Sequence, residues 1–196
     1  MRKLQTTLLL ILGLCFAVDV QAQDPEFTQF YAAPIYTNPA LAGTGTCGGG
    51  GRVVLNYRNQ WPSLPGTFVT SSASYDQHFD KIGGGISLLL LDDRAGEGLL
   101  SSKTASVGYA YQLEVNRRVA IRFGIEGQYG QRSIDWEKLR FEDQIDPSQG
   151  FVRETAEQYN GDPVNYANFN TGMVVYTERF YGGVAVHNLI EPVQSF

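Results

Sequence analysis

Few residues in this chain could act in catalysis or bind a metal, and their spacing does not assemble a reactive site. Asp135 and Glu137 flank Trp136, and paired carboxylates beside an aromatic ring are found in glycoside hydrolases, where one acid protonates the leaving group. No second feature of the sequence supports that chemistry. His78 and His187 stand apart from each other and from any cysteine, so they suggest neither a Ser-His-Asp triad nor a metal site.

A second acidic group, Asp92, Asp93 and Glu97, lies with Arg94 in a glycine-containing stretch that we expect to be a loop. Carboxylates near glycine occur in calcium loops, but this spacing departs from the alternating pattern of those loops. A solvated turn with an internal salt bridge is the simpler interpretation. The sequence therefore predicts no catalytic residue, no bound metal and no cofactor.

The first 22 residues have the pattern of a secretory signal peptide. Arg2 and Lys3 precede an apolar run from Leu8 to Val18, and small residues flank a cleavage position after Ala22. The alternative is a membrane-anchoring helix, which would need about 20 apolar residues. Cleavage leaves Cys47 as the only cysteine, so no internal disulfide and no cysteine-based metal site is expected.

Residues 118–131 alternate between apolar and polar side chains. The apolar face holds Val119, Ile121, Phe123, Ile125 and Tyr129, and the polar face holds Arg118, Ala120, Arg122, Gly124, Glu126, Gln128 and Gly130. This period of two predicts a β-strand, and a tilted strand of about 9–11 residues crosses a bilayer. The polar face carries charges of both signs, so we expect Arg118, Arg122, Glu126 and Gln128 to line a water-filled lumen.

Six other segments read as strands of the same sheet. They are residues 52–59, 67–79, 82–91, 104–113, 166–177 and 180–187. Short turns alternate with longer connections between them, which is the plan of outer-membrane barrels. The sequence thus predicts an all-β fold, an antiparallel transmembrane β-barrel at 52–196 preceded by an extended periplasmic segment at 23–51. A soluble β-sandwich has similar strand spacing and remains an alternative.

Seven strands do not close a simple barrel, because single-chain bacterial barrels use even numbers from about 8 upward. Residues 191–196 do not alternate like a closing strand. We therefore expect the chain to be the N-terminal part of a longer barrel, and so truncated. The formal net charge of −5 and the lack of a basic stripe argue against a nucleic-acid partner.

Several blocks of the sequence resemble the PorP/SprF family. They are Gln23–Tyr31 with Asn38–Gly43, Asn56–Pro62, Gly83–Ile86 running into Asp92–Gly96, and His187–Pro192. The blocks keep the order of the family and cover nearly the whole chain after the predicted signal peptide. The resemblance is therefore specific.

This resemblance implies a non-enzymatic outer-membrane barrel of the type IX secretion system, linked to gliding motility in some members. It implies outer-membrane lipid, periplasmic components of that machine and secreted surface proteins as partners. Members are usually longer than this chain, in agreement with the expected truncation. Two alternatives are a passive porin for small solutes and a secreted carbohydrate-active β-sandwich that uses Asp135 and Glu137.

Candidate partner-binding residues gather in three stretches of the chain. The proline-marked N-terminal segment is interpreted as a docking strip, as a plug in the lumen, or as a segment packed against the barrel wall. Trp61 is expected to anchor at the membrane interface and Arg58 to form an ion pair in the lumen, with cargo binding as the alternative for both. The full set is Phe27, Phe30, Tyr31, Tyr36, Asn38, Arg58, Gln60, Trp61, Asp92, Asp93 and Arg94.

Overall fold

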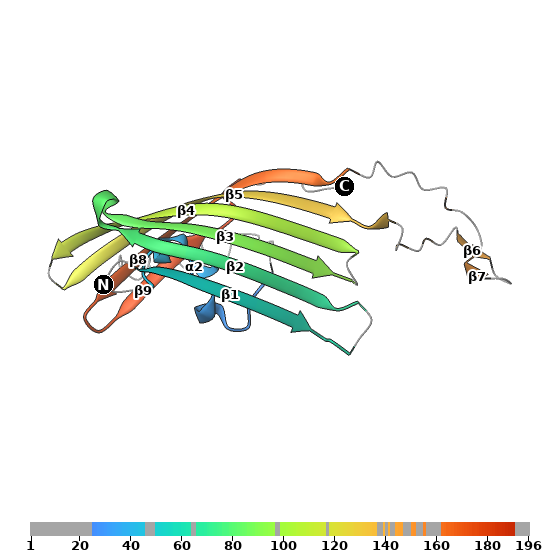
Figure 1. Ribbon diagram of the computed structural model, residues 1–196, viewed down its shortest axis with the longest axis horizontal. Helices are drawn as coiled ribbons and strands as arrows, with labels where there is room; N and C mark the ends of the chain where they lie inside the picture. The colour runs from blue at the N-terminus through green and yellow to red at the C-terminus, as the bar shows by residue number, and fades with distance from the viewer. Residues whose placement is uncertain are drawn as a thin grey trace, which may run out of the picture.

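A single antiparallel sheet dominates the fold (Figure 1). The computed structural model describes residues 25–45, 50–63, 66–96, 99–116, 118–136, 139, 141, 144–146, 150–151, 155 and 162–190. Its strands are β1 (Gly51–Gln60), β2 (Phe68–Phe79), β3 (Gly84–Ala95), β4 (Leu100–Asn116), β5 (Val119–Ile134), β8 (Val164–Thr177) and β9 (Tyr181–Val186). They lie side by side in chain order as a seven-stranded meander, which confirms the predicted all-β antiparallel fold.

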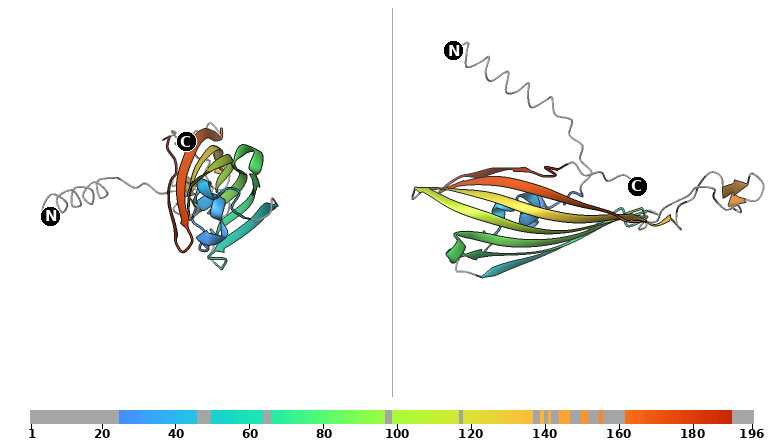
Figure 2. Two further views of the ribbon diagram at one scale, coloured as in Figure 1. Left: turned by 90° about the vertical axis from the view of Figure 1, so that its left-hand side faces the viewer. Right: turned by 90° about the horizontal axis from the view of Figure 1, so that it is seen from above.

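The sheet curves into a half-barrel around the N-terminal segment, as the end-on view in Figure 2 shows. Among the described residues, β1 pairs only with β2 and β9 only with β8, so both outer strands present an open edge. A single curved sheet of this kind differs from the two packed layers of a sandwich. In the part of the chain that is described, no helix is long and apolar enough to cross a membrane.

The alternation predicted for residues 118–131 is present in β5. Arg122 and Glu126 are buried on the concave face, whereas Phe123, Ile125 and Tyr129 are exposed on the convex face. The stretch from Val119 to Tyr129 is about 33 Å long at about 3.3 Å per residue. Tilted by about 40°, it covers about 25 Å, the height of the apolar band on membrane barrels.

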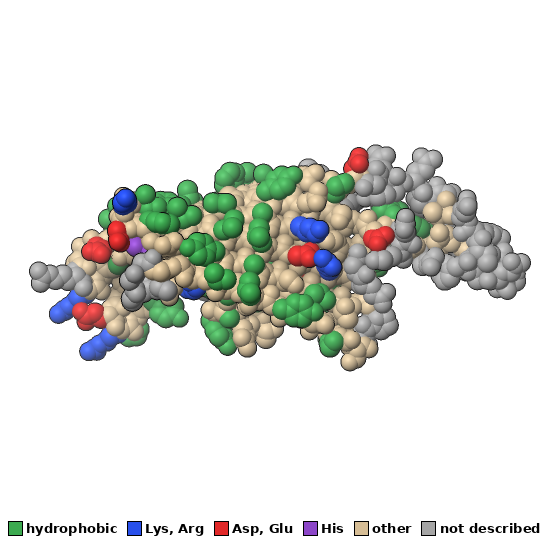
Figure 3. All heavy atoms as spheres, in the orientation of Figure 1, with side chains coloured by type: hydrophobic (Ala, Val, Ile, Leu, Met, Phe, Trp, Pro, Cys, Tyr) green, Lys and Arg blue, Asp and Glu red, His purple; other side chains and the backbone are tan. Residues whose placement is uncertain are grey.

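The convex face carries an apolar band across its middle and charged side chains towards both ends (Figure 3). At the end where the longer loops lie, the change is abrupt. Leu90, Ala105 and Tyr129 are cross-strand neighbours, and the next outward-facing row is Asp92, Lys103 and Gln131. On β3, β4 and β5 the band therefore ends within one row of side chains.

One predicted loop is part of the sheet instead. Asp92, Asp93 and Arg94 were expected in a loop, but β3 continues to Ala95 because its ladder with β4 continues, with Asp92 opposite Lys103. The predicted internal salt bridge is present, since Arg94 Nη2 lies 2.8 Å from Asp92 Oδ2.

The N-terminal segment also differs from expectation. Residues 30–41 are not extended but form three helical turns, η1 (Phe30–Ala32), α2 (Pro34–Thr37) and η2 (Pro39–Leu41). Pro34 and Pro39 begin the second and third turns, because proline has a backbone angle suited to the first helical position and lacks an N–H that would go unpaired there.

Two of the connections between strands contain short elements of their own. The β2–β3 turn contains η3 (Asp80–Ile82), and the long connection after β5 contains a two-stranded hairpin of β6 (Ile145–Asp146) and β7 (Gly150–Phe151). The predicted signal peptide at 1–22, Cys47, Glu97 and Glu137 lie outside the described residues.

Candidate functional site in the concave face

The concave face is crossed by a row of residues with little or no side chain, here called the small-residue row. Its members are direct cross-strand partners on five neighbouring strands: Gly85, Ala110, Gly124, Gly172 and Ala185. Residues 38–43 pack on this row. A Cβ added to Gly124 would overlap the backbone of Ala40, and one added to Gly172 would overlap the side chain of Asn38. The row therefore allows residues 38–43 to lie directly against the backbone of the sheet, and we call this contact surface the seat of the N-terminal segment.

The approach is closest at Gly43 and Gly85. A Cβ on either glycine would lie 2.7 Å from the Cα of the other. Gly43 also has a φ of +76°, a conformation that residues with a Cβ rarely adopt. Glycine is therefore required at both positions for the segment to lie flat on β3.

Asn38 joins the segment to the last two strands. Its Oδ1 accepts a hydrogen bond from the Ala40 N–H at 2.9 Å, which caps η2, and its Nδ2 donates to the Val184 carbonyl of β9 at 3.1 Å. The side chain is buried. Asn38 thus satisfies a helix terminus and a strand carbonyl at the same time.

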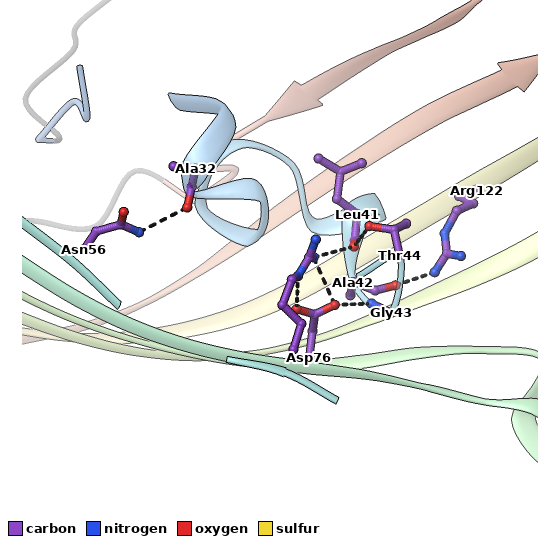
Figure 4. Close-up of polar contacts among 9 residues, drawn as sticks. Ala32, Leu41, Ala42, Gly43, Thr44, Asn56, Asp76 and Arg122 are labelled. Carbon is purple, nitrogen blue, oxygen red and sulfur yellow. Dashed lines mark hydrogen bonds and ion pairs between the residues drawn. The ribbon is translucent and has the colours of Figure 1, made fainter. Parts of the chain in front are cut away.

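Asp76 on β2 binds the other end of the segment (Figure 4). Its Oδ2 accepts from the Gly43 N–H at 2.7 Å, and Arg52 donates to the same carboxylate through Nε at 2.8 Å and Nη2 at 3.0 Å. Arg52 Nη2 also reaches the Leu41 carbonyl at 3.4 Å. The Asp76 side chain has no exposed surface, so its charge is compensated entirely by these contacts.

Arg122 on β5 binds the carbonyl groups between these two ends. Its Nε donates to the Ala40 carbonyl at 3.0 Å, its Nη2 donates to the Ala42 carbonyl, and its Nη1 donates to Gln112 Oε1 at 2.8 Å. Only 3% of Arg122 is exposed. The predicted inward direction of Arg122 is present, but at this level the concave face contains Asn38–Gly43 where a water-filled lumen was expected.

The rest of the N-terminal segment lies along β1 on the concave side. Asn56 Nδ2 donates to the Ala32 carbonyl at 3.3 Å, as Figure 4 shows. Phe27 and Tyr36 form an edge-to-face pair with ring centroids 5.3 Å apart. Phe30 and Tyr31, in contrast, are 66% and 71% exposed.

The candidates on β1 lie at its loop end. Arg58 donates to Gln60 Oε1 at 2.6 Å and also to the Glu26 carbonyl. Trp61 follows the strand, is exposed, and packs edge-to-face on Phe68 at 5.7 Å. The structure therefore brings Arg58 and Gln60 together with the N-terminal segment and leaves Trp61 on the surface.

The four residues expected in the lumen occupy two different places. Glu126 and Gln128 face the concave side, and both accept hydrogen bonds from Asn170 Nδ2, at 2.8 Å and 3.1 Å. Arg118 lies in the β4–β5 turn with its side chain 80% exposed and its Nε 3.4 Å from Glu178. Arg118 is therefore at the rim, because β5 begins one residue later, at Val119.

Asp92 and Asp93 face opposite sides of β3. Asp93 points inward and accepts from Thr70 Oγ1 at 2.6 Å, while Asp92 points outward with Arg94. Trp136 stacks on Phe141 with ring centroids 5.2 Å apart. Within the described residues, no group of three or more His, Cys, Asp or Glu side chains could hold a metal ion.

Reasoning from sequence did not single out Asp76, Arg52 or the glycines of the small-residue row as a site. One local signal was available for Asp76. Thr70, Ser72, Ser74 and Asp76 occupy alternate positions of β2, and all are buried although polar. An acid at the end of such a row indicates a charged contact inside the sheet.

Comparison with known proteins places this architecture in a family. The model of the family described as "Type IX secretion system membrane protein PorP/SprF" matches residues 19–196. No curated protein and no solved structure matches the chain. The matched region includes the whole described sheet and the segment seated in it.

Proposed function

Because the chain belongs to the PorP/SprF family of type IX secretion system membrane proteins, we propose that it is a non-enzymatic outer-membrane component that binds or anchors secreted surface proteins. The observation that carries this proposal is the combination of the family with a half-barrel whose convex face is apolar. A β-sheet with one apolar face and one polar face suits a barrel wall in lipid.

The two ends of the sheet support an orientation in the outer membrane. Tight turns join β2 to β3, β4 to β5 and β8 to β9 at one end, while the connection between β5 and β8 at the other end is the longest. Outer-membrane barrels have short periplasmic turns and longer extracellular loops. The turn end would face the periplasmic components of the machine, and a cleaved signal peptide at 1–22 would direct export.

Cargo binding is assigned to the open concave side. Phe30 and Tyr31 lie there as an exposed edge-to-face pair with ring centroids 5.8 Å apart. Exposed apolar patches often mark interaction sites, and aromatic residues are enriched in the cores of protein interfaces. The other candidate residues of the N-terminal segment make contacts within the protein: Asn38 is buried, and Phe27 packs on Tyr36.

The proposal is tested by affinity purification of the full-length protein from cell envelopes, followed by mass spectrometry of the proteins that co-purify. We expect secreted surface proteins and periplasmic secretion components with the wild type. The double variant Phe30→Ala, Tyr31→Ala would lose the surface proteins, whereas the control Tyr57→Ala, at an exposed outward position of β1, would retain them. Recovery of the same proteins with both variants would contradict the role of the aromatic pair.

A passive porin remains the second candidate function. The Asn38–Gly43 segment on the small-residue row argues against it, because the segment occupies the inner face at the level of Arg122. Open-channel conductance in planar bilayers, with no protein co-purifying, would favour the porin. The carbohydrate-active alternative receives no support from a single curved sheet, and it predicts a soluble protein with activity on sugars.

A further inference from the structure

The convex face contains a groove at the boundary between its apolar band and its charged end. The groove has a volume of about 600 Å³. Its floor consists of the small outward-facing residues Ala73 and Ala105, and its walls include Leu90 and Tyr129. Small side chains between larger ones create the depression. It lies on the side of the sheet opposite to the seat of the N-terminal segment.

The loop-side rim of this groove is polar and carries a cation. Ser71, Asp92, Lys103 and Gln131 form the next row of cross-strand neighbours, on the loop side of the groove floor. Asp92 is paired with Arg94 at 2.8 Å, whereas Lys103 makes no ion pair with any described residue. The positive charges of Lys103 and Arg94 exceed the single negative charge of Asp92, so the net charge of these three side chains is positive. Figure 3 shows charged side chains of both signs beside the apolar band towards the loop end.

An apolar floor below a positive rim is complementary to one kind of ligand, an amphiphile with an anionic head and hydrocarbon chains. The exposed Lys103 suits a phosphate group, and its neighbour Tyr129 is a residue type that prefers the membrane interface. A soluble anion would gain nothing from the apolar floor, and a neutral lipid would gain nothing from Lys103. The apolar floor and the positive rim together therefore favour a membrane lipid that carries phosphate.

We propose that this groove binds one lipid of the outer leaflet, a phosphorylated glycolipid of the lipid A type. An acyl chain would lie over Ala73 and Ala105, and a phosphate would contact Lys103. The choice of leaflet rests on the proposed orientation, in which the loop end faces outward. The inference goes beyond the proposed function, because the groove is separate from the concave side assigned to cargo.

The test uses the full-length protein purified from envelopes in mild detergent, with lipid A per protein measured by mass spectrometry. Ala105→Phe fills the groove, and its control Val107→Phe places the same ring on the same strand and face outside the groove. Lys103→Gln removes the cation from the rim, and Lys81→Gln removes an exposed lysine at the turn end. All four positions are exposed, so the changes leave the packing of the concave face intact.

We expect the wild type and both controls to retain lipid A. Lys103→Gln should lower retention about fivefold, the effect of one cation near a charged membrane surface, and Ala105→Phe should abolish it. Equal retention by Ala105→Phe and Val107→Phe, or a wild type without lipid, would overturn the proposal. Retention of glycerophospholipid in place of lipid A would overturn the assignment to the outer leaflet. Recovery of cargo is measured separately, so failure of the proposed function is distinguished from failure of the lipid site.

Discussion

Gly124 and Gly172 are direct cross-strand partners on β5 and β8, and residues 38–40 of the same chain pack on both of them. A glycine inside a strand weakens that strand, and it often marks a place where another part of the backbone approaches closely. Here the space is used by Asn38 and Ala40. The N-terminal segment and the sheet are therefore complementary surfaces of one structure.

This complementarity predicts a large difference between two glycines of β5. Gly124→Ala should destabilise the protein by about 1–3 kcal/mol, the usual cost of overpacking, because its Cβ would overlap the Ala40 backbone. Gly127→Ala is the matched control, since its Cβ would meet Phe169 at an ordinary 3.7 Å. Urea unfolding in lipid vesicles measures both. Equal stabilities of the two variants would contradict the close packing of Ala40 on Gly124.

Removing the charge of Asp76 should loosen the same segment from its other end. Asp76→Asn leaves Arg52 without its carboxylate partner and weakens the bond from Gly43, so we expect a loss of about 3–5 kcal/mol, as for a broken buried pair. Increased cleavage between residues 25 and 45 by added protease would report release of the segment.

The control for this change is Arg118→Gln. The Arg118–Glu178 contact at 3.4 Å is mostly exposed, and surface ion pairs contribute about 0–1 kcal/mol. Arg118→Gln should therefore leave both unfolding and protease resistance near those of the wild type. A loss as large as that of Asp76→Asn would show that charge removal acts non-specifically.

Charge on the convex face should be costly in the middle of the apolar band and tolerated at its end. Ile125→Arg places a guanidinium in the band, where we expect a cost of about 2–4 kcal/mol, whereas Ser133→Arg near the loops should cost about 0–1 kcal/mol. The amount of folded protein in isolated outer membranes, measured by heat-modifiable migration on gels, compares the two. If both variants accumulate equally, the band does not face lipid.

The sheet was predictable because its signal is local. The alternation of Val119–Tyr129 shows within a single strand, and it correctly placed Arg122 and Glu126 on the inner face. The end of β3 was not predictable in the same way, because the polarity of Asp92 and Asp93 is typical of a loop. Pairing with both neighbouring strands, β2 and β4, extends the strand through them.

The seat was not predictable because it depends on the register of distant strands. Gly85, Gly124 and Gly172 are far apart in the sequence and become one row only when β3, β4, β5 and β8 pair. The charges on the polar face of residues 118–131 predict a water-filled lumen. The three glycines instead match the shape of Asn38–Gly43, a relationship that single-strand patterns do not contain.

We propose that β5 lies in a bilayer with its odd-numbered side chains in lipid and its even-numbered side chains facing the concave side. A nitroxide scan of positions 125–129 in the membrane-embedded full-length protein, measuring collision rates with oxygen and with a water-soluble nickel chelate, tests this placement. We expect high oxygen accessibility at 125, 127 and 129 and low oxygen accessibility at 126 and 128. Absence of this alternation, or odd positions shielded from oxygen, would contradict it.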